Sequence, residues 1–201
     1  MHEHQHKSTQ PEHATSTEAR DTEPRPSPAI YVASLADYNN GTLHGAWIDA
    51  ARAPEAIQAD VEAMLARSRE PNAEEWAIHD YEQFGRWRVG EYDTIEQVSG
   101  IARGIAEHGY AYAAWADICD GDLDTSRFEG AYLGHYDSTI DYVEQMADEL
   151  GYTAELAKLP EYLQNYVHID YSAIARDMDA SGEIAAVHDP QGGVWLFNVT
   201  T

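Results

Sequence analysis

The chain has 201 residues, of which 36 are Asp or Glu and 12 are Lys or Arg, so its formal net charge is −24 at pH 7. A protein with this much negative charge repels nucleic acid, anionic membranes and acidic substrates. It attracts proteins that carry a basic groove, and most such proteins bind DNA. Apolar residues make up 43% of the chain, too many for a disordered acidic protein. No apolar run approaches the roughly 20 residues that a membrane-spanning helix needs, and the single cysteine, Cys119, cannot form a disulfide within the chain. We therefore expect a soluble cytoplasmic protein.

Residues 1–27 are predicted to form a disordered tail, because they are rich in Thr, Ser, Pro, Glu and His and have no hydrophobic periodicity. Residues 28–92 are predicted to form an N-terminal α+β domain. Its expected elements are a hairpin of strands over 29–34 and 42–49 around Asn39-Asn40-Gly41, a helix over 53–68 and a third strand over 75–81.

Residues 93–126 are predicted to form a helical middle domain, and residues 127–201 a C-terminal α+β domain. In the middle domain we expect a helix that begins at Thr94 and ends at Gly109, then a helix over 110–119. The C-terminal domain is expected to contain a helix over 138–150 capped by Ser138 or Asp137, short helices over 160–167 and 170–179, and a closing hairpin of 183–188 with 194–199. Because no regular βαβ alternation appears, the fold class is α+β, with antiparallel hairpins and short helices.

Two patterns have the spacing of metal motifs, but neither predicts a specific site. His2-Glu3-His4-Gln5-His6 matches HExxH, which needs a packed helix, whereas here it lies in the predicted tail. Asp120-Gly121-Asp122-Leu123-Asp124 has the first three ligands of an EF-hand loop, but Thr125 and Ala131 stand where the Gly and the Glu are needed. The other candidates for chemistry, His44, His79 and His135, are expected to be partly buried and structurally satisfied.

The stretch 117–149 carries ten carboxylates against one base, Arg127; they are Asp117, Asp120, Asp122, Asp124, Glu129, Asp137, Asp141, Glu144, Asp148 and Glu149. On the predicted helix over 138–150, Asp141, Glu144 and Asp148 form one row, with about 5.4 Å between successive turns. Duplex DNA carries about one charge per 1.7 Å of its axis, a density that several such rows side by side approach. An ordinary solvated helix face intersperses Lys or Arg, so their scarcity favours phosphate mimicry.

Three segments resemble the ArdA antirestriction protein family: 29–49 (AIYVASLADYNNGTLHGAWID), 74–82 (EEWAIHDYE) and 128–150 (FEGAYLGHYDSTIDYVEQMADEL). The likeness extends over about residues 27–201. The third segment is similar to the family's antirestriction motif, which here comprises Glu129, Tyr132, Gly134, Tyr136 and Ser138 with the acids that follow.

This resemblance implies a non-enzymatic inhibitor of type I restriction–modification enzymes, carried by a plasmid or transposon and needing no cofactor. It implies an elongated chain of three small α/β domains that forms a homodimer, imitates bent duplex DNA and occupies the DNA groove of the methyltransferase core. The dimer interface is left open between the C-terminal strands and the helix near Tyr136. The chain departs from the family pattern in its N-terminal tail and in Arg86 and Arg88, basic residues that would weaken the mimic locally.

The sequence thus predicts an acidic DNA mimic whose ten carboxylates imitate phosphates, with an affinity that falls as salt rises and depends on no single acid. Two alternatives stay open. A metal-dependent hydrolase using the cluster over 117–124 predicts stoichiometric binding of a divalent ion and loss of function in Asp122→Asn. An unrelated binding module that is acidic only for solvation, as in salt-loving organisms, predicts salt-dependent folding and no affinity for DNA-binding enzymes.

Overall fold

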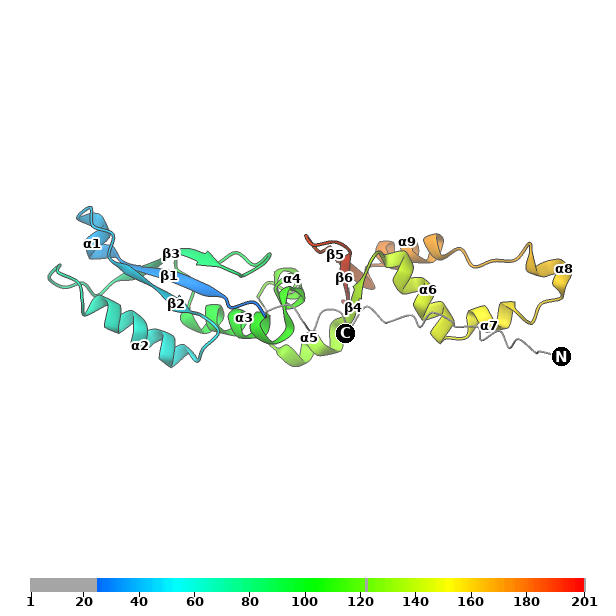
Figure 1. Ribbon diagram of the computed structural model, residues 1–201, viewed down its shortest axis with the longest axis horizontal. Helices are drawn as coiled ribbons and strands as arrows, with labels where there is room; N and C mark the ends of the chain where they lie inside the picture. The colour runs from blue at the N-terminus through cyan, green and yellow to red at the C-terminus, as the bar shows by residue number, and fades with distance from the viewer. Residues whose placement is uncertain (1–24, 122, 201) are drawn as a thin grey trace, which may run out of the picture.

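The computed structural model of the protein describes residues 25–121 and 123–200, so the predicted tail, apart from residues 25–27, lies outside the described residues. Within this range the fold is mixed α+β, as expected, with nine helices and two antiparallel sheets of three strands each. The chain is elongated: the first sheet lies towards one end, the second near the middle, and α7 and α8 at the other end (Figure 1). No helix in the described part of the chain is long and apolar enough to cross a membrane.

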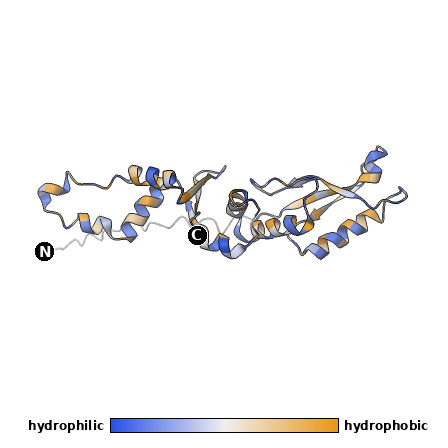
Figure 2. Cartoon of the chain, turned by 180° about the vertical axis from the view of Figure 1, so that it is seen from behind, coloured by the Kyte–Doolittle hydropathy of each residue, from blue (hydrophilic) through white to orange (hydrophobic). Residues whose placement is uncertain are grey.

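The first sheet places β1 (Ala29–Ser34) between β2 (Gly45–Asp49) and β3 (Trp76–Glu82), and both neighbours run antiparallel to it. Helix α2 (Pro54–Leu65) packs against this sheet, and Figure 2 shows its hydrophobic residues alternating with hydrophilic ones. Its buried side chains recur at spacings of three and four: Ile57, Val61 and Met64. The predicted pairing of the first two strands, the helix and the third strand are confirmed.

A short helix, α1 (Leu35–Asn39), stands between β1 and β2, where the sequence predicted only a turn. Ser34 caps it, because its Oγ accepts a hydrogen bond from the Asp37 backbone N–H at 3.4 Å. β2 therefore begins at Gly45 and not at Thr42. The prediction missed this helix because one helical turn is too short to show a hydrophobic period.

Two helices connect the sheets, α3 (Ile95–His108) and α4 (Tyr110–Ile118). Thr94 Oγ1 accepts a hydrogen bond from the Gln97 N–H at 3.2 Å, and Gly109, at φ +73°, separates the helices, as the sequence predicts. The two helices approach closely at Gly104, where a Cβ would lie 2.1 Å from Tyr112 Cε1. Their buried side chains belong to one core that continues from α2 to the second sheet: Ile101, Ile105, Tyr112, Trp115, Phe128 and Phe197.

The C-terminal part builds the second sheet and a helical extension. Its elements are α5 (Thr125–Ala131), β4 (Tyr132–Tyr136), α6 (Thr139–Glu149), α7 (Tyr152–Leu156), α8 (Glu161–Gln164), α9 (Tyr171–Ser181), β5 (Ile184–His188) and β6 (Val194–Asn198). The predicted closing hairpin is β5–β6, and β4 pairs with the other side of β6. The sequence predicted neither α5, β4 nor α7, and it extended α8 too far. These elements are short, and α7 and α8 bury no side chain.

Candidate protein-interaction surface

Nine of the ten predicted phosphate-mimicking carboxylates are described, and all nine are exposed to solvent; Asp122 lies outside the described residues. They occupy the end of α4, the helix α5, the β4–α6 connection and α6, which follow one another along the long axis of the molecule (Figure 1). Their order is Asp117, Asp120, Asp124, Glu129, Asp137, Asp141, Glu144, Asp148 and Glu149. We call this set the acidic surface.

The predicted row of acids on α6 is present because the helix begins where the sequence places it. Ser138 is the cap, and its Oγ accepts a hydrogen bond from the Asp141 N–H at 3.3 Å. Val143 and Ala147 are fully buried on the inner side of α6, while Asp141, Glu144 and Asp148 are exposed. Within the described residues, the Glu144 carboxylate forms neither a hydrogen bond nor an ion pair.

Several members of the acidic surface accept hydrogen bonds from neutral groups, which do not offset their negative charge. Thr153 Oγ1 donates to Asp148 at 2.6 Å, and Gln145 Nε2 donates to Glu149 at 2.8 Å. Asp124 caps α5 and accepts from the Ser126 hydroxyl at 2.6 Å and from the Ser126 N–H at 3.0 Å. Both hydrogen bonds lower the pKa of Asp124 below its ordinary value, and the one from the hydroxyl has the larger effect. The carboxylate is therefore ionised at neutral pH.

Asp117 forms an ion pair with a basic side chain. Arg86 Nε lies 3.6 Å from Asp117 Oδ2, and both side chains are about half exposed, at 48% and 46%. Arg86 thus offsets part of the negative charge at the end of α4. The sequence marked Arg86 as an interruption of the mimic without indicating which acid it pairs with.

The residues of the predicted antirestriction motif span the end of α5, the strand β4 and the cap of α6. The Tyr132 ring stacks on Phe128, with centroids 5.2 Å apart and planes 16° apart. Gly134 has φ +130°, and a Cβ there would lie 2.9 Å from Tyr136 Cε2. Tyr136 donates a hydrogen bond from its hydroxyl to the Leu133 carbonyl at 3.2 Å. Within this motif, the tyrosines therefore pack against neighbouring residues, and Gly134 allows the backbone conformation of β4.

Two tyrosines join β4 to α6. The rings of Tyr136 and Tyr142 meet edge to face with centroids 5.2 Å apart. Burial raises the pKa of both phenols, and the nearby negative charge of Glu149 raises them further. Both hydroxyls therefore stay neutral, so the local negative charge comes from carboxylates alone.

The candidates for metal or acid–base chemistry are separated and have structural partners. His44 Nε2 lies 2.8 Å from the Met64 carbonyl oxygen, and His135 Nε2 lies 3.0 Å from that of Gly192 and 3.1 Å from Asp189 Oδ2. In the part of the chain that the structure describes, no three His, Cys, Asp or Glu residues are grouped so that they could hold a metal ion. The HExxH match at 2–6 falls outside that part.

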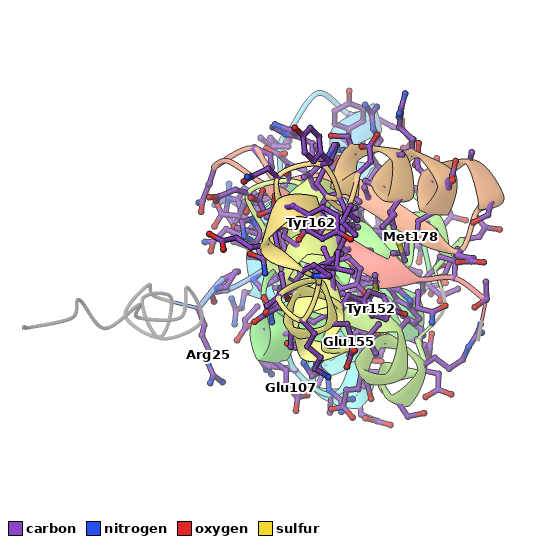
Figure 3. The ribbon with its side chains drawn as sticks, turned by 90° about the vertical axis from the view of Figure 1, so that its right-hand side faces the viewer. Arg25, Glu107, Tyr152, Glu155, Tyr162 and Met178 are labelled. Atoms are coloured by element: carbon purple, nitrogen blue, oxygen red, sulfur yellow. The ribbon has the colours of Figure 1, made fainter. Side chains whose placement is uncertain are left out.

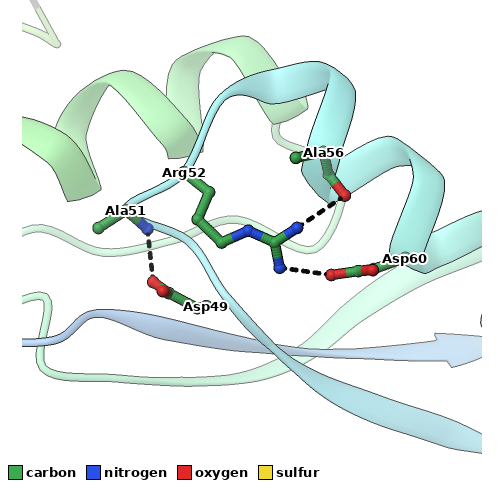
Figure 4. A network of polar contacts seen from close by, with 5 residues as sticks. All are labelled: Asp49, Ala51, Arg52, Ala56 and Asp60. Atoms are coloured by element: carbon green, nitrogen blue, oxygen red, sulfur yellow. Dashed lines mark hydrogen bonds and ion pairs between the residues drawn. The ribbon is translucent and has the colours of Figure 1, made fainter.

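Sequence reasoning did not single out the acids of the first sheet. Asp49, Asp80 and Glu82 are exposed on its two outer strands. The nearby Arg52 donates from Nη1 to Asp60 Oδ2 at 2.6 Å and from Nη2 to the Ala56 carbonyl at 3.3 Å (Figure 4). The sequence could have indicated these acids, because side chains two residues apart on a strand, such as Asp80 and Glu82, point to the same face.

Comparison with known proteins gives one clear match. The sequence profile of the family described as antirestriction protein (ArdA) matches residues 30–191, which is most of the chain. A search of curated proteins finds no match.

Proposed function

The chain belongs to the antirestriction protein (ArdA) family, and we propose that it inhibits type I restriction–modification enzymes by imitating the DNA that they bind. The family consists of inhibitors that target restriction–modification enzymes without catalysing a reaction. The observation that carries the proposal is the acidic surface: nine exposed carboxylates that follow the long axis of an elongated chain.

In this mechanism the carboxylates take the place of DNA phosphates in the basic groove of the methyltransferase core. The row on α6 spaces its charges by about one helical turn, and the remaining acids extend the field along the molecule. Binding displaces counterions from both partners, so affinity falls as the salt concentration rises. Because the potential is a sum over many charges, no single acid is essential.

The shape of the mimic is proposed to come from three successive units, residues 28–92, 93–126 and 127–201, and from association of two chains. Exposed apolar side chains gather in the C-terminal extension and support association through this half of the chain: Leu150, Tyr152, Tyr162, Tyr166 and Val167. Figure 3 looks at this end of the molecule and shows Tyr152 and Tyr162 on it. A dimer would double the charge and lengthen the imitation.

A competition experiment tests the proposal. Labelled duplex DNA is bound to a type I methyltransferase and titrated with the protein at low and at moderate salt. We expect stoichiometric displacement of DNA that weakens with salt. The matched variants are Asp141→Asn/Glu144→Gln, on the acidic surface, and Glu55→Gln/Glu62→Gln, which removes as many exposed charges from α2. Displacement should weaken more for the first pair. A folded protein that displaces no DNA at low salt would refute mimicry of this enzyme and favour acidic solvation.

No observation favours a metal-dependent hydrolase. Of its predicted cluster, Asp117 is paired with Arg86 and Asp124 caps a helix, while Asp122 lies outside the described residues. Inhibition by the charged surface is therefore the function that the chain supports best.

A further inference from the structure

One face of the first sheet is open. Because side chains alternate along a strand, Ile30, Val32 and Ile48 enter the core, whereas Tyr31 and Trp47 point to the opposite face. Figure 1 shows α2 along one side of the sheet, and no helix of the described residues along the other. Trp47 is accordingly 49% exposed, which is unusual for so large an apolar side chain.

An aromatic pair covers the centre of this open face. Tyr31 and Trp47 are directly opposite each other across β1 and β2, and their ring centroids are 5.6 Å apart with the planes tilted by 57°. Gly45 makes room for the pair, because a Cβ at this position would lie 2.7 Å from Tyr31 Cζ. The tyrosine ring therefore extends over the backbone of β2, beside the indole, and presents an aromatic surface to solvent.

Carboxylates surround the aromatic pair. The register places Asp80 of β3 opposite Tyr31, and it places Asp49 and Glu82 on either side of Ala29 in the next row. Residues paired across antiparallel strands point to the same face, and Asp49 and Glu82 are two strand spacings, about 10 Å, apart. The small Ala29 leaves a gap between these two acids. Within the described residues, none of the three carboxylates has an ion pair.

The base that follows β2 does not neutralise these acids. Arg52 is bound to Asp60 and to the Ala56 carbonyl of α2, while Asp49 Oδ1 accepts a hydrogen bond from the Ala51 N–H at 2.9 Å (Figure 4). The open face thus combines exposed aromatic rings with uncompensated negative charge. A planar guanidinium matches both features, because it stacks on aromatic rings and donates paired hydrogen bonds to carboxylates.

We propose that this open face is a docking surface for arginine side chains of the protein that the chain inhibits, an inference that rests on the proposed function. A guanidinium stacks on Tyr31 and Trp47 and donates hydrogen bonds to Asp49 or Glu82 beside Ala29. The contact adds aromatic stacking to the charge attraction of the acidic surface, and a lysine makes it less well, because its ammonium is compact and strongly hydrated.

The first test uses peptides and needs no enzyme. The indole N–H signals of the protein are followed by NMR while hexa-arginine or hexa-lysine is added. We expect hexa-arginine to shift the Trp47 signal more than hexa-lysine does, and to leave the signal of Trp115, which is 2% exposed, in place. Equal shifts with both peptides, or a Trp47 signal that does not move, would overturn the proposal whether or not the chain inhibits the enzyme.

The second test repeats the DNA competition with Trp47→Leu, which keeps an apolar side chain and removes the aromatic face. We expect about three- to tenfold weaker displacement, and an unchanged dependence on salt because no charge is lost. Trp47→Phe should recover most of the affinity, and Tyr92→Leu, at a 73% exposed tyrosine outside this face, should match the wild type. Folded Trp47→Leu that displaces DNA as well as the wild type would refute the docking surface. Failure of the wild type itself would instead refute the proposed function.

Discussion

At the scale of single residues, Gly134 is the motif position where the backbone decides which residue fits. Its backbone has φ +130°, a conformation that residues with a side chain rarely adopt. A Cβ at this position would also lie only 2.9 Å from the Tyr136 ring. We expect Gly134→Ala to lower the free energy of unfolding by about 1–3 kcal/mol, measured by urea denaturation. Gly130→Ala is the control, because nothing lies within 4 Å of its Cβ and α5 is helical there. Equal stabilities of the two variants would show that Gly134 is not constrained.

Asp37 gives the stability of the protein a dependence on acid pH. Its side chain is buried. The hydrogen bond from the Ser34 hydroxyl has the largest effect and lowers the pKa of Asp37 below the ordinary 3.8. The hydrogen bond from the Ser68 hydroxyl, at 2.6 Å, lowers it further. A depressed pKa in the folded state stabilises the protein above pH 3.8, and this contribution is lost as the pH falls through the lower, folded value.

Removing one donor should therefore matter more at neutral than at acid pH. We expect Ser68→Ala to lower the unfolding free energy at neutral pH and to lose most of this effect once the pH is below the folded pKa of Asp37. Thermal or urea unfolding at several pH values measures it. The control is Ser181→Ala, because the exposed Ser181 hydroxyl donates to the Met178 carbonyl and not to a carboxylate. A stability difference that is constant with pH would show that Asp37 is not the group responsible.

At the scale of elements, the acids of α6 oppose stability while serving the proposed binding. Glu144 lies three residues after Asp141 and four before Asp148, and like charges at these spacings cost about 0.2–0.5 kcal/mol per pair. We expect Glu144→Gln to raise the unfolding free energy by about 0.4–1 kcal/mol at low salt and to weaken displacement of DNA slightly. High salt should erase the gain. A loss of stability would mean that the row is not under repulsion.

Removing the ion pair between the segment after β3 and α4 should strengthen the displacement of DNA, whereas removing an acid weakens it. Arg86→Gln frees Asp117, so we expect stronger displacement of DNA in the competition experiment. The change in stability should stay within about 1 kcal/mol, because the pair is half exposed. Arg88→Gln removes the same charge without breaking an ion pair of the described residues, and it should strengthen displacement less. Equal effects would show that only net charge counts.

At the scale of the whole molecule, the net charge of −24 acts as a sum. Neutralising Asp148 alone should weaken DNA displacement less than about threefold, whereas Asp141→Asn/Glu144→Gln/Asp148→Asn should weaken it several-fold more, and salt should reduce the difference. The competition curves measure both, and circular dichroism confirms that the variants are folded. A single replacement that abolishes displacement would contradict a distributed field.

The sequence by itself determined the features that depend on neighbouring residues. The start of α3 at Thr94, the start of α6 next to Ser138, the strands β1, β3, β5 and β6, and the one-sided row of acids on α6 all follow from local hydrogen bonding and periodicity. The resemblance to an antirestriction family also came from sequence, and the family profile confirms it. The division into three domains and the role of each acid remain predictions.

Only the tertiary structure decided the features that depend on distant partners. Strand β4 exists because it pairs with β6, some sixty residues later, although its own sequence is short and contains Gly134. Arg86 and Asp117 meet only when the segment after β3 lies beside α4, and Tyr31 meets Trp47 only through the register of β1 and β2. Local patterns fix which face of an element is apolar or charged, but which of these faces are covered depends on long-range packing, and packing leaves the aromatic and acidic face of the first sheet open.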